Sequence, residues 1–222
     1  MPIVKIERIT DKADELIAGS AKLCYSKTNP TNVFKNLNAE TVERMTNLLV
    51  NAGHGSPFEH ASVTFSIQGI SRACSHQLVR HRIASYSQQS QRYVDLGRGV
   101  FIIPPSIFSN QEALTKYDDV LEKIGDVYQE LIDMGIPKED ARYLLPNATT
   151  TNLIMTMNFR QLFHFFNLRC CSRAQWEIRN LANDMLDKCK EVYPNIFKNA
   201  GAPCISGKCP EGEMSCKKGG NK

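Results

Sequence analysis

Between Glu59 and Asp95 the chain carries no acidic residue, and this gap strongly constrains how it can fold. The gap holds four arginines and three histidines, namely Arg72, Arg80, Arg82, Arg92, His60, His76 and His81. Arginine presents a planar fork of donors that matches phosphate or carboxylate, and several arginines placed together repel one another unless an anion arrives. The segment therefore forms either a solvated basic face or, as we favour, a site for an external anion.

Length and composition narrow the class of protein. A chain of 222 residues with 42% hydrophobic residues can bury a sizeable core, and a single domain is the default expectation. The formal net charge of +4 is modest, so nucleic-acid binding would have to depend on a local patch. Charged residues interrupt every apolar run near the N-terminus, and no window approaches the roughly 18 apolar residues of a membrane span. We therefore expect a cytoplasmic protein.

The eight cysteines are expected to be reduced thiols, because the chain shows no export signal. Five of them fall in predicted helices or at helix ends: Cys24, Cys74, Cys170, Cys171 and Cys189. The remaining three, Cys204, Cys209 and Cys216, lie in a Gly-, Pro- and Lys-containing tail over 199–222, which we expect to be mobile. Three sulfurs at irregular spacing do not make a standard zinc site, so we predict no metal.

The basic segment follows a predicted strand. Residues 61–68 alternate apolar and polar side chains, which is the period of a half-buried strand. Ser71 can cap a following helix in which Gln77, Arg80 and His81 share one face. Because 83–91 then become polar and irregular, the arginines are expected to straddle a helix end and a loop.

Helical periodicity and a second strand account for most of the remaining chain. Helices are predicted over 10–24, 38–52, 110–135, a short segment opened by Pro137 that carries Arg142, 159–169 and 174–192, with a strand over 149–157. Asn38 and Asn158 are the expected caps of two helices, and Gly53 and Gly135 the expected ends of two. Val42, Met45, Leu49 and Ala52 form the predicted apolar face of the helix over 38–52. The pattern indicates a mixed α/β domain without internal repeats.

Several common sites are missing from the sequence. It contains neither of the glycine-rich phosphate-binding patterns, G-x-G-x-x-G and G-x-x-x-x-G-K-[ST], and neither H-E-x-x-H nor paired C-x-x-C. Side chains must therefore do much of the work if this chain binds phosphates. His54 and His60 are spaced too widely to stack on one helix face, so we expect structural or substrate-contact roles for them.

Three blocks together resemble the flavin-dependent thymidylate synthase family: "GHGSPFEHASVTFSI" (53–67), "RHRIASYSQQSQRY" (80–93) and "NFRQLFHFFNLRCCSRAQWEI" (158–178). The second block contains Arg-His-Arg followed by seven residues and Ser90, a pattern highly specific to that family. The likeness covers about 1–198. It implies a single domain with a central, mainly antiparallel sheet flanked by long helices. It also implies methylation of dUMP at C5, with methylenetetrahydrofolate as carbon donor and FAD reduced by NADPH as hydride source.

The resemblance also assigns ligand contacts residue by residue. It places FAD against Ser56, Arg80, His81, Arg82, Gln88, Asn158, Arg160 and His164. It places dUMP against Gln77, Leu78, Val79, Arg80, Gln88, Gln89, Ser90, Gln91, Arg92, Arg142 and Arg169. Many family members have glutamate at the position of Gln88 and asparagine at that of His164, and both replacements keep hydrogen-bonding ability.

Arg169 is the residue that we expect to carry the chemistry. The family places it against the uracil ring, where a fixed cation stabilises negative charge that develops as C5 becomes nucleophilic. Without the resemblance it would be interpreted as a helix-end arginine that neutralises carbonyl dipoles. We assign Ser90 to phosphate binding, and we expect neither Cys170 nor Cys171 to act as a nucleophile.

Two other function classes compete with this interpretation. The 72–92 segment could belong to a nucleic-acid-binding module, although residues 60–94 contain no lysine and no recognised DNA or RNA motif appears. The chain could also be another flavin reductase that lacks the folate step. The family is homotetrameric with active sites shared between subunits, so a homotetramer is the expected assembly.

Overall fold

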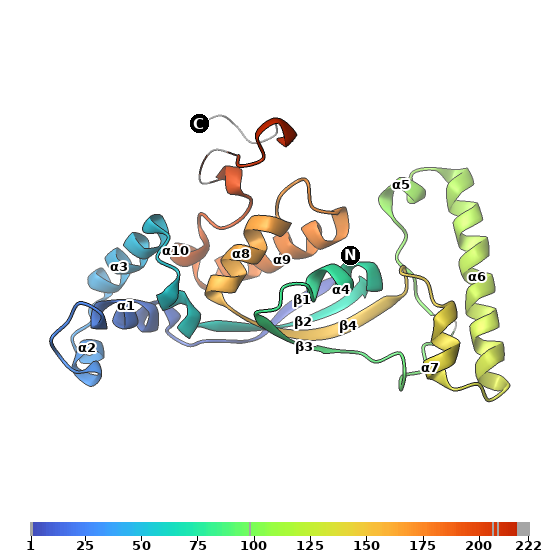
Figure 1. The fold of residues 1–222 in the computed structure, drawn as a ribbon, viewed down its shortest axis with the longest axis horizontal. Coiled ribbons are helices and arrows are strands. Elements are labelled where there is room, and N and C mark those ends of the chain that lie inside the picture. The colour runs from blue at the N-terminus through green and yellow to red at the C-terminus, as the bar shows by residue number, and fades with distance from the viewer. Residues whose placement is uncertain (1, 98, 206, 208, 217–222) are drawn as a thin grey trace. The chain divides into compact units, whose positions relative to one another are not determined.

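The computed structural model describes residues 2–97, 99–205, 207 and 209–216. It contains one four-stranded sheet in the order β1-β2-β4-β3, formed by Ile3–Ile9, Ser62–Ser71, Thr150–Asn158 and Ala84–Gln88 (Figure 1). Hydrogen bonds run from Thr64 to Thr156 and from Gly69 to Asn152, so β2 and β4 are antiparallel. The predicted mixed α/β fold with an antiparallel sheet is confirmed.

Two of the four strands were missed by the sequence interpretation. The predicted strands correspond to β2 and β4, and Val63, Phe65 and Ile67 are fully buried along β2 as the alternation predicts. The expectation that residues 83–91 are irregular was wrong, because β3 occupies the first part of this range. Its residues are mostly polar, so β3 lacked the hydrophobic alternation on which the prediction depended.

The chain folds into two compact units, and the strands pass from one unit into the other. We call 1–3, 67–80 and 86–154 the α6 unit, and 4–66, 81–85 and 155–222 the α8 unit, after a helix in each. The predicted boundary between a domain at 1–198 and a tail at 199–222 stays a prediction.

The α6 unit contains α4 (Arg72–Leu78), α5 (Pro105–Phe108), α6 (Gln111–Asp133), α7 (Lys138–Ala141) and the 3-10 turn η2 (Arg142–Leu144). Asn110 caps α6 by accepting a hydrogen bond from the Ala113 amide, and Gly135 follows its end with a φ of 83°. Ser71 caps α4 as predicted. However, α4 ends at Leu78, so the expectation that Arg80 and His81 continue the helix face of Gln77 was wrong.

The α8 unit contains α1 (Ala13–Leu23), α2 (Pro30–Lys35), α3 (Ala39–Ala52), η1 (Ser56–His60), α8 (Phe159–Arg169), α9 (Trp176–Val192) and α10 (Pro194–Phe197). Helix α1 packs against α2 and α3, and α8 packs against α9 and η1 (Figure 1). Phe159, Phe165, Phe166 and Phe197 are fully buried and form a cluster of aromatic rings in its core, where Phe58 and Phe65 are buried as well. Asn38 and Asn158 cap α3 and α8 as predicted, whereas Ala52 is exposed rather than part of the apolar face.

The tail includes two short 3-10 turns, η3 (Pro203–Ile205) and η4 (Gly212–Met214). Part of the segment that we expect to be mobile, namely 206, 208 and 217–222, lies outside the described residues. Among the helices of the described ranges, none combines the length and the apolar composition needed to cross a membrane.

Candidate active site

The arginine of the turn after β3 has a carboxylate partner. Arg92 Nη2 lies 2.8 Å from Glu139 Oε2, and Arg92 Nε donates to the same oxygen at 2.9 Å. This hydrogen bond raises the pKa of the Arg92 guanidinium above its ordinary value, with the charges of Tyr93 and Glu139 acting in the same direction. Sequence proximity could not reveal this partner, because Glu139 comes from α7 in a distant part of the chain.

Glu139 also positions another predicted dUMP arginine of this unit. Arg142 Nε donates to the main-chain oxygen of Glu139 at 3.1 Å, so one residue of α7 orients two arginines. Burial lowers the pKa of the Arg72 guanidinium, and the positive charge of Arg142 lowers it further. The α6 unit therefore holds arginines whose mutual repulsion an incoming anion would relieve.

Gln88 is fixed by two hydroxyl groups. Its side-chain nitrogen donates to Ser75 Oγ at 3.0 Å and to Thr151 Oγ1 at 3.1 Å. Ser75 in turn donates to the main-chain oxygen of Arg72 at 3.0 Å. The amide at position 88 therefore donates to two hydroxyl oxygens. An ionised carboxylate at this position could not donate to either of them.

The next residues form an ordered turn. Asn152 donates to Gln89 Oε1 at 3.1 Å, and the Ser90 hydroxyl accepts from the main-chain nitrogen of Arg92 at 3.1 Å. Gln91 is half-buried beside them. The Ser90 contact closes a local turn of the kind that presents main-chain and hydroxyl groups to an anion.

Residues 77–80, at and after the end of α4, differ in how much of each side chain is exposed. Leu78 is fully buried, so only its main chain can meet a ligand, whereas Val79 and Arg80 are exposed. Tyr86 donates from its hydroxyl to the Leu78 carbonyl at 2.9 Å, and burial raises the pKa of this phenol to about 12. Tyr86 therefore acts as a neutral hydrogen-bond donor that fixes this turn.

In the α8 unit, the predicted FAD residue Arg160 borders a cavity of about 690 Å³. His54, Gly55, Phe58 and Asn167 also line this cavity, which has the volume of a typical small-molecule site. Arg160 forms an ion pair with Glu59. A side-chain carbon on Gly55 would lie 3.0 Å from Arg160 Nε, so glycine allows the guanidinium to lie against the main chain.

Arg169 is the last residue of α8, and a buried histidine holds it in place. Its Nε donates to His81 Nε2 at 3.0 Å, which assigns the unprotonated nitrogen of His81 to Nε2. Burial lowers the pKa of His81 to about 4, helped by the charges of Arg169 and His164. His81 is only 5% exposed, and its ring packs edge-on against Phe165 at a centroid distance of 5.0 Å. A neutral imidazole therefore holds Arg169 without cancelling its charge.

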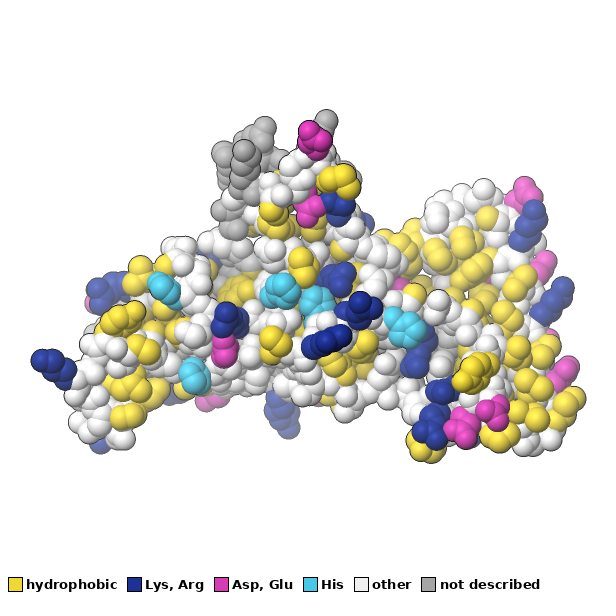
Figure 2. Space-filling model, in the orientation of Figure 1, with side chains coloured by type: hydrophobic (Ala, Val, Ile, Leu, Met, Phe, Trp, Pro, Cys, Tyr) yellow, Lys and Arg dark blue, Asp and Glu magenta, His cyan; other side chains and the backbone are white. Residues whose placement is uncertain are grey.

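The other predicted FAD residues of the α8 unit come from η1, from α8 with its cap, and from the segment before β3. Ser56 begins η1 and is exposed, as are Arg82 and His164. The Asn158 side-chain oxygen accepts from the Gln161 amide at 2.8 Å, so capping of α8 occupies this oxygen. Figure 2 shows histidine and basic side chains together around the position of α8, with carboxylates sparse among them. This face suits an anionic ligand.

The two cysteines after Arg169 do not share its environment. Burial raises the pKa of the Cys170 thiol to about 12, with the charge of Asp187 adding to the shift and that of Lys190 opposing it. Cys171 instead lines a separate small cavity with residues of the tail. A protonated thiol is a poor nucleophile, so the Cys170 environment supports the prediction that it does not attack the pyrimidine.

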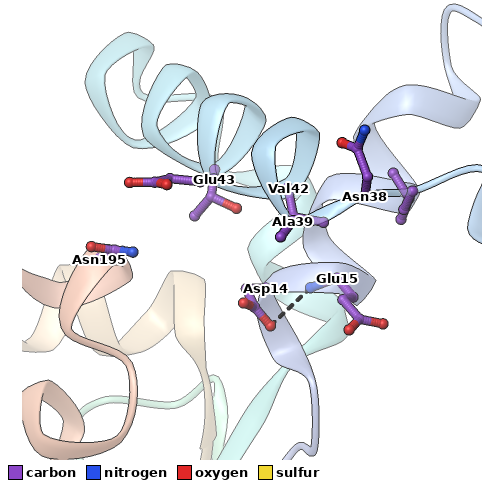
Figure 3. A pocket seen from close by; sticks show the side chains of 9 residues that line it. Asp14, Glu15, Asn38, Ala39, Val42, Glu43 and Asn195 are labelled. Atoms are coloured by element: carbon purple, nitrogen blue, oxygen red, sulfur yellow. Dashed lines mark hydrogen bonds between the residues drawn. The ribbon is translucent and has the colours of Figure 1, made fainter.

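A second cavity of the α8 unit has the opposite electrostatic character. Its volume is about 350 Å³, and Asp14, Glu15 and Glu43 line it together with Asn38 and Asn195 (Figure 3). The Glu15 amide donates to the Asp14 carboxylate at 3.0 Å. Three carboxylates repel phosphate, so this cavity does not suit either predicted nucleotide.

Sequence analysis missed three residues that contact predicted ligand-binding residues. Glu59, Glu139 and Tyr86 contact predicted ligand-binding residues but were not candidates themselves. Glu59 directly follows "GSPF" within the first family block, so this position carried a signal. The sequence holds no comparable signal for Glu139, because its pairing depends on how the chain folds.

Comparison with known proteins gives a match along most of the chain. The family model described as "Thymidylate synthase complementing protein" matches residues 5–195. The chain is 47% identical to a flavin-dependent thymidylate synthase of Clostridium tetani over 97% of its length and 93% of that protein. It is 48% identical to one of Geobacter sulfurreducens, over 94% of this chain and 91% of that protein.

A solved structure shares the fold. The UMP/dUMP methylase PolB of Streptomyces cacaoi, bound with 5-Br dUMP, superposes with a TM-score of 0.78 at 24% sequence identity. The alignment covers 89% of this chain and 93% of PolB.

Proposed function

Because the chain belongs to the flavin-dependent thymidylate synthase family, we propose that it methylates C5 of dUMP to yield dTMP. The observation that carries this proposal is the family match over residues 5–195, which spans all three motif blocks. Methylenetetrahydrofolate is the carbon donor and leaves as tetrahydrofolate, and NADPH is the source of reducing equivalents.

FAD is the cofactor, and the α8 unit carries residues that fit it. Arg160 and Gly55 border a cavity of about 690 Å³, and the absence of a side chain on Gly55 lets the guanidinium approach the main chain. Ser56, Arg82, Asn158 and His164 would hold the cofactor together with Arg160. Bound flavin supplies hydride transfer, and the protein supplies charge-assisted contacts to its pyrophosphate.

Arg169 stabilises the developing negative charge on the pyrimidine. A cation aimed at the place where charge develops lowers the barrier most when its orientation is set beforehand. The hydrogen bond from Arg169 to neutral His81 provides that orientation. His81 therefore serves as a positioning residue rather than only as a contact to FAD.

The dUMP phosphate is bound by the turn after β3. Arg92, the Ser90 hydroxyl and the main chain between Gln88 and Arg92 supply charge and donors, and Arg142 adds a second guanidinium. The exposed ion pair of Arg92 with Glu139 keeps the arginine oriented before substrate arrives. The two contacts with Glu139 use Nε and Nη2, and Nη1 can donate to a phosphate oxygen.

The assembly is a homotetramer with shared active sites, and the compartment is the cytoplasm. Mixing an Arg82→Ala chain with an Arg169→Ala chain tests the sharing directly, because a hybrid site can then contain both arginines. We expect partial recovery of activity after subunit exchange. If mass spectrometry shows that subunits have exchanged but no activity returns, each active site lies within a single subunit.

A turnover assay tests the proposed function. Purified protein with dUMP, methylenetetrahydrofolate and NADPH should form dTMP, and added FAD should increase the rate of any flavin-depleted fraction. NADPH oxidation that never depends on dUMP would instead indicate another flavin reductase. A colourless protein that binds nucleic acid tightly would indicate the nucleic-acid-binding module based on residues 72–92.

A further inference from the structure

A small cavity lies in the α8 unit, between the loop that follows α8 and the C-terminal tail. Four cysteines line it: Cys171 from the loop and Cys204, Cys209 and Cys216 from the tail. We call it the thiol cavity. Its volume is about 20 Å³, which is enough for a single water-sized or ion-sized occupant. An organic ligand needs a site of roughly 300 Å³ or more.

An ion pair that involves no sulfur joins the tail to this loop. Arg173 of the loop pairs with Glu211 of the tail. Within the tail, the Ile205 amide donates to the Ala202 carbonyl at 3.0 Å, and Ile205 packs so closely on Gly201 that an added side-chain carbon would lie 2.6 Å from it. The four cysteines therefore line one cavity through contacts that do not depend on their sulfurs.

Four thiols around an ion-sized cavity match the ligand set of a structural zinc site. Such sites are tetrahedral, often use four cysteine sulfurs, and commonly contain a pair separated by two to four residues. Cys204 and Cys209 are separated by four residues. The sequence alone offered only the three sulfurs of the tail, and the fold supplies the fourth from Cys171, far upstream.

We propose that Cys171, Cys204, Cys209 and Cys216 bind a zinc ion as a tetrathiolate site that fastens the tail to the loop after α8. Within the described residues, no three His, Cys, Asp or Glu side chains yet stand in positions that hold a metal ion. Binding therefore draws the sulfurs together, and each thiol releases its proton to solvent as its sulfur bonds to the ion. Zinc binding would therefore stabilise the described turns of the tail against the loop after α8.

The first test measures the metal content of the full-length protein after incubation with Zn²⁺ under reducing conditions and desalting. We expect about one zinc ion per chain, and the intense visible absorption of a tetrahedral cobalt thiolate when Co²⁺ replaces Zn²⁺. Protein that retains no zinc would overturn the proposal. Mass spectrometry that finds disulfides among the four cysteines after anaerobic purification would overturn it as well.

Variants locate the site. Cys171→Ser and Cys204→Ser should each lower zinc affinity at least about tenfold, since each removes a ligand of the ion. Cys24→Ser is the matched control, because Cys24 is an exposed cysteine directly after α1 and does not line the thiol cavity. Wild-type zinc content in Cys171→Ser would disprove the tetrathiolate site.

A footprint on the unaltered protein keeps the test informative if a variant fails to fold. Iodoacetamide labelling with and without Zn²⁺, read by peptide mass spectrometry, should show protection of the four cavity cysteines and unchanged labelling of Cys24. Equal labelling of the four cysteines in both conditions would contradict the proposal.

Discussion

Two arginines proposed to act in the same reaction are held by opposite kinds of partner. In the α6 unit, Arg92 is exposed and pairs with the carboxylate of Glu139. In the α8 unit, Arg169 is half-buried and donates to the neutral imidazole of His81. Both partners orient a guanidinium, but only Glu139 offsets its charge.

This difference matches what each arginine is proposed to do. A phosphate carries its full charge before and after the reaction, so an arginine that binds it needs orientation more than an unopposed charge. Charge on the pyrimidine develops only as the reaction proceeds, and a nearby carboxylate would weaken the field that stabilises it. We infer that the partner of each arginine distinguishes binding from catalysis.

The largest expected effect comes from removing the arginine held by the imidazole. Arg169→Ala should lower kcat by about 10²- to 10³-fold, the range observed when a donor that stabilises developing charge is removed. Flavin absorbance of the purified protein should remain, because the loss lies in the chemical step. Loss of bound flavin in step with activity would instead place Arg169 among the cofactor contacts.

Cys170→Ala provides the matched control at the neighbouring position. Burial raises the pKa of Cys170 to about 12, so the thiol is protonated near neutral pH and the variant should keep most of its activity. Background turnover in a variant that binds dUMP and flavin normally would make Cys170 the nucleophile.

Changing the charge of the Arg169 partner tests the comparison itself. His81→Glu can still accept from Arg169 but places a negative charge beside it, so kcat should fall on the order of tenfold or more. His81→Gln keeps a neutral acceptor and should lose less. If His81 serves only in packing, both variants should lose stability and flavin, and kcat should not fall further in His81→Glu than in His81→Gln.

The arginine of the ion pair should respond in the opposite way. Arg92→Ala should raise the KM for dUMP about tenfold with little change in kcat, because it removes a charge-assisted contact present in both ground and transition states. Glu139→Gln leaves Arg92 in place without the opposing charge, so KM should change only a few-fold. A loss of kcat at unchanged KM in Arg92→Ala would give Arg92 a catalytic role and remove the distinction.

The sequence was sufficient to predict α8, which carries Arg169, together with β2 and α9, because local signals define these elements. Alternation in residues 61–68, the Asn158 cap and the apolar period over 174–192 all depend on neighbours in sequence, and β2, α8 and α9 confirm them. Strand β3 escaped prediction because its side chains are polar and pairing with β4 defines it.

The partners of the arginines were harder to predict, because each depends on contacts between distant segments. Glu139 lies 47 positions from Arg92, and His81 lies 88 positions from Arg169. The family resemblance named His81 as a cofactor contact, but only the fold brings its imidazole to Arg169. Burial, which sets the charge of that imidazole, is likewise a property of the folded chain.

The buried imidazole also predicts a pH dependence of stability. Its pKa is about 4 in the folded chain and ordinarily 6.5, so between these values only the unfolded chain binds the proton. The free energy of unfolding should therefore fall as pH drops from about 6.5 to about 4, by at most about 1.4 kcal/mol per pH unit. Urea unfolding at several pH values gives the free energy of unfolding of the wild type and of His81→Gln. The difference between the two pH profiles should show this slope, and identical profiles would contradict the prediction.

The smallest expected effect concerns Gln88. Its side-chain amide donates to two hydroxyl groups, those of Ser75 and Thr151. Ser75 donates to the Arg72 carbonyl and accepts from Gln88, while Thr151 accepts from both Gln88 and Arg72 Nη1. A glutamate at position 88 cannot donate. The Ser75 hydroxyl must then either donate to the carboxylate and lose its hydrogen bond to the Arg72 carbonyl, or keep that bond and place an oxygen lone pair against the carboxylate.

Gln88→Glu should therefore lower the free energy of unfolding by about 1 kcal/mol, the cost of a mismatched hydrogen bond, and Gln88→Met should lose at least as much. The glutamate would also bring a carboxylate close to Arg72, which donates from Nη1 to the neutral Thr151 hydroxyl. If an opposing charge weakens anion binding, the KM for dUMP should rise a few-fold in Gln88→Glu but not in Gln88→Met. KM values should be measured at low salt. Equal values in these two variants would show that a negative charge beside an arginine of the α6 unit does not weaken dUMP binding, which would contradict the proposed importance of the partner's charge.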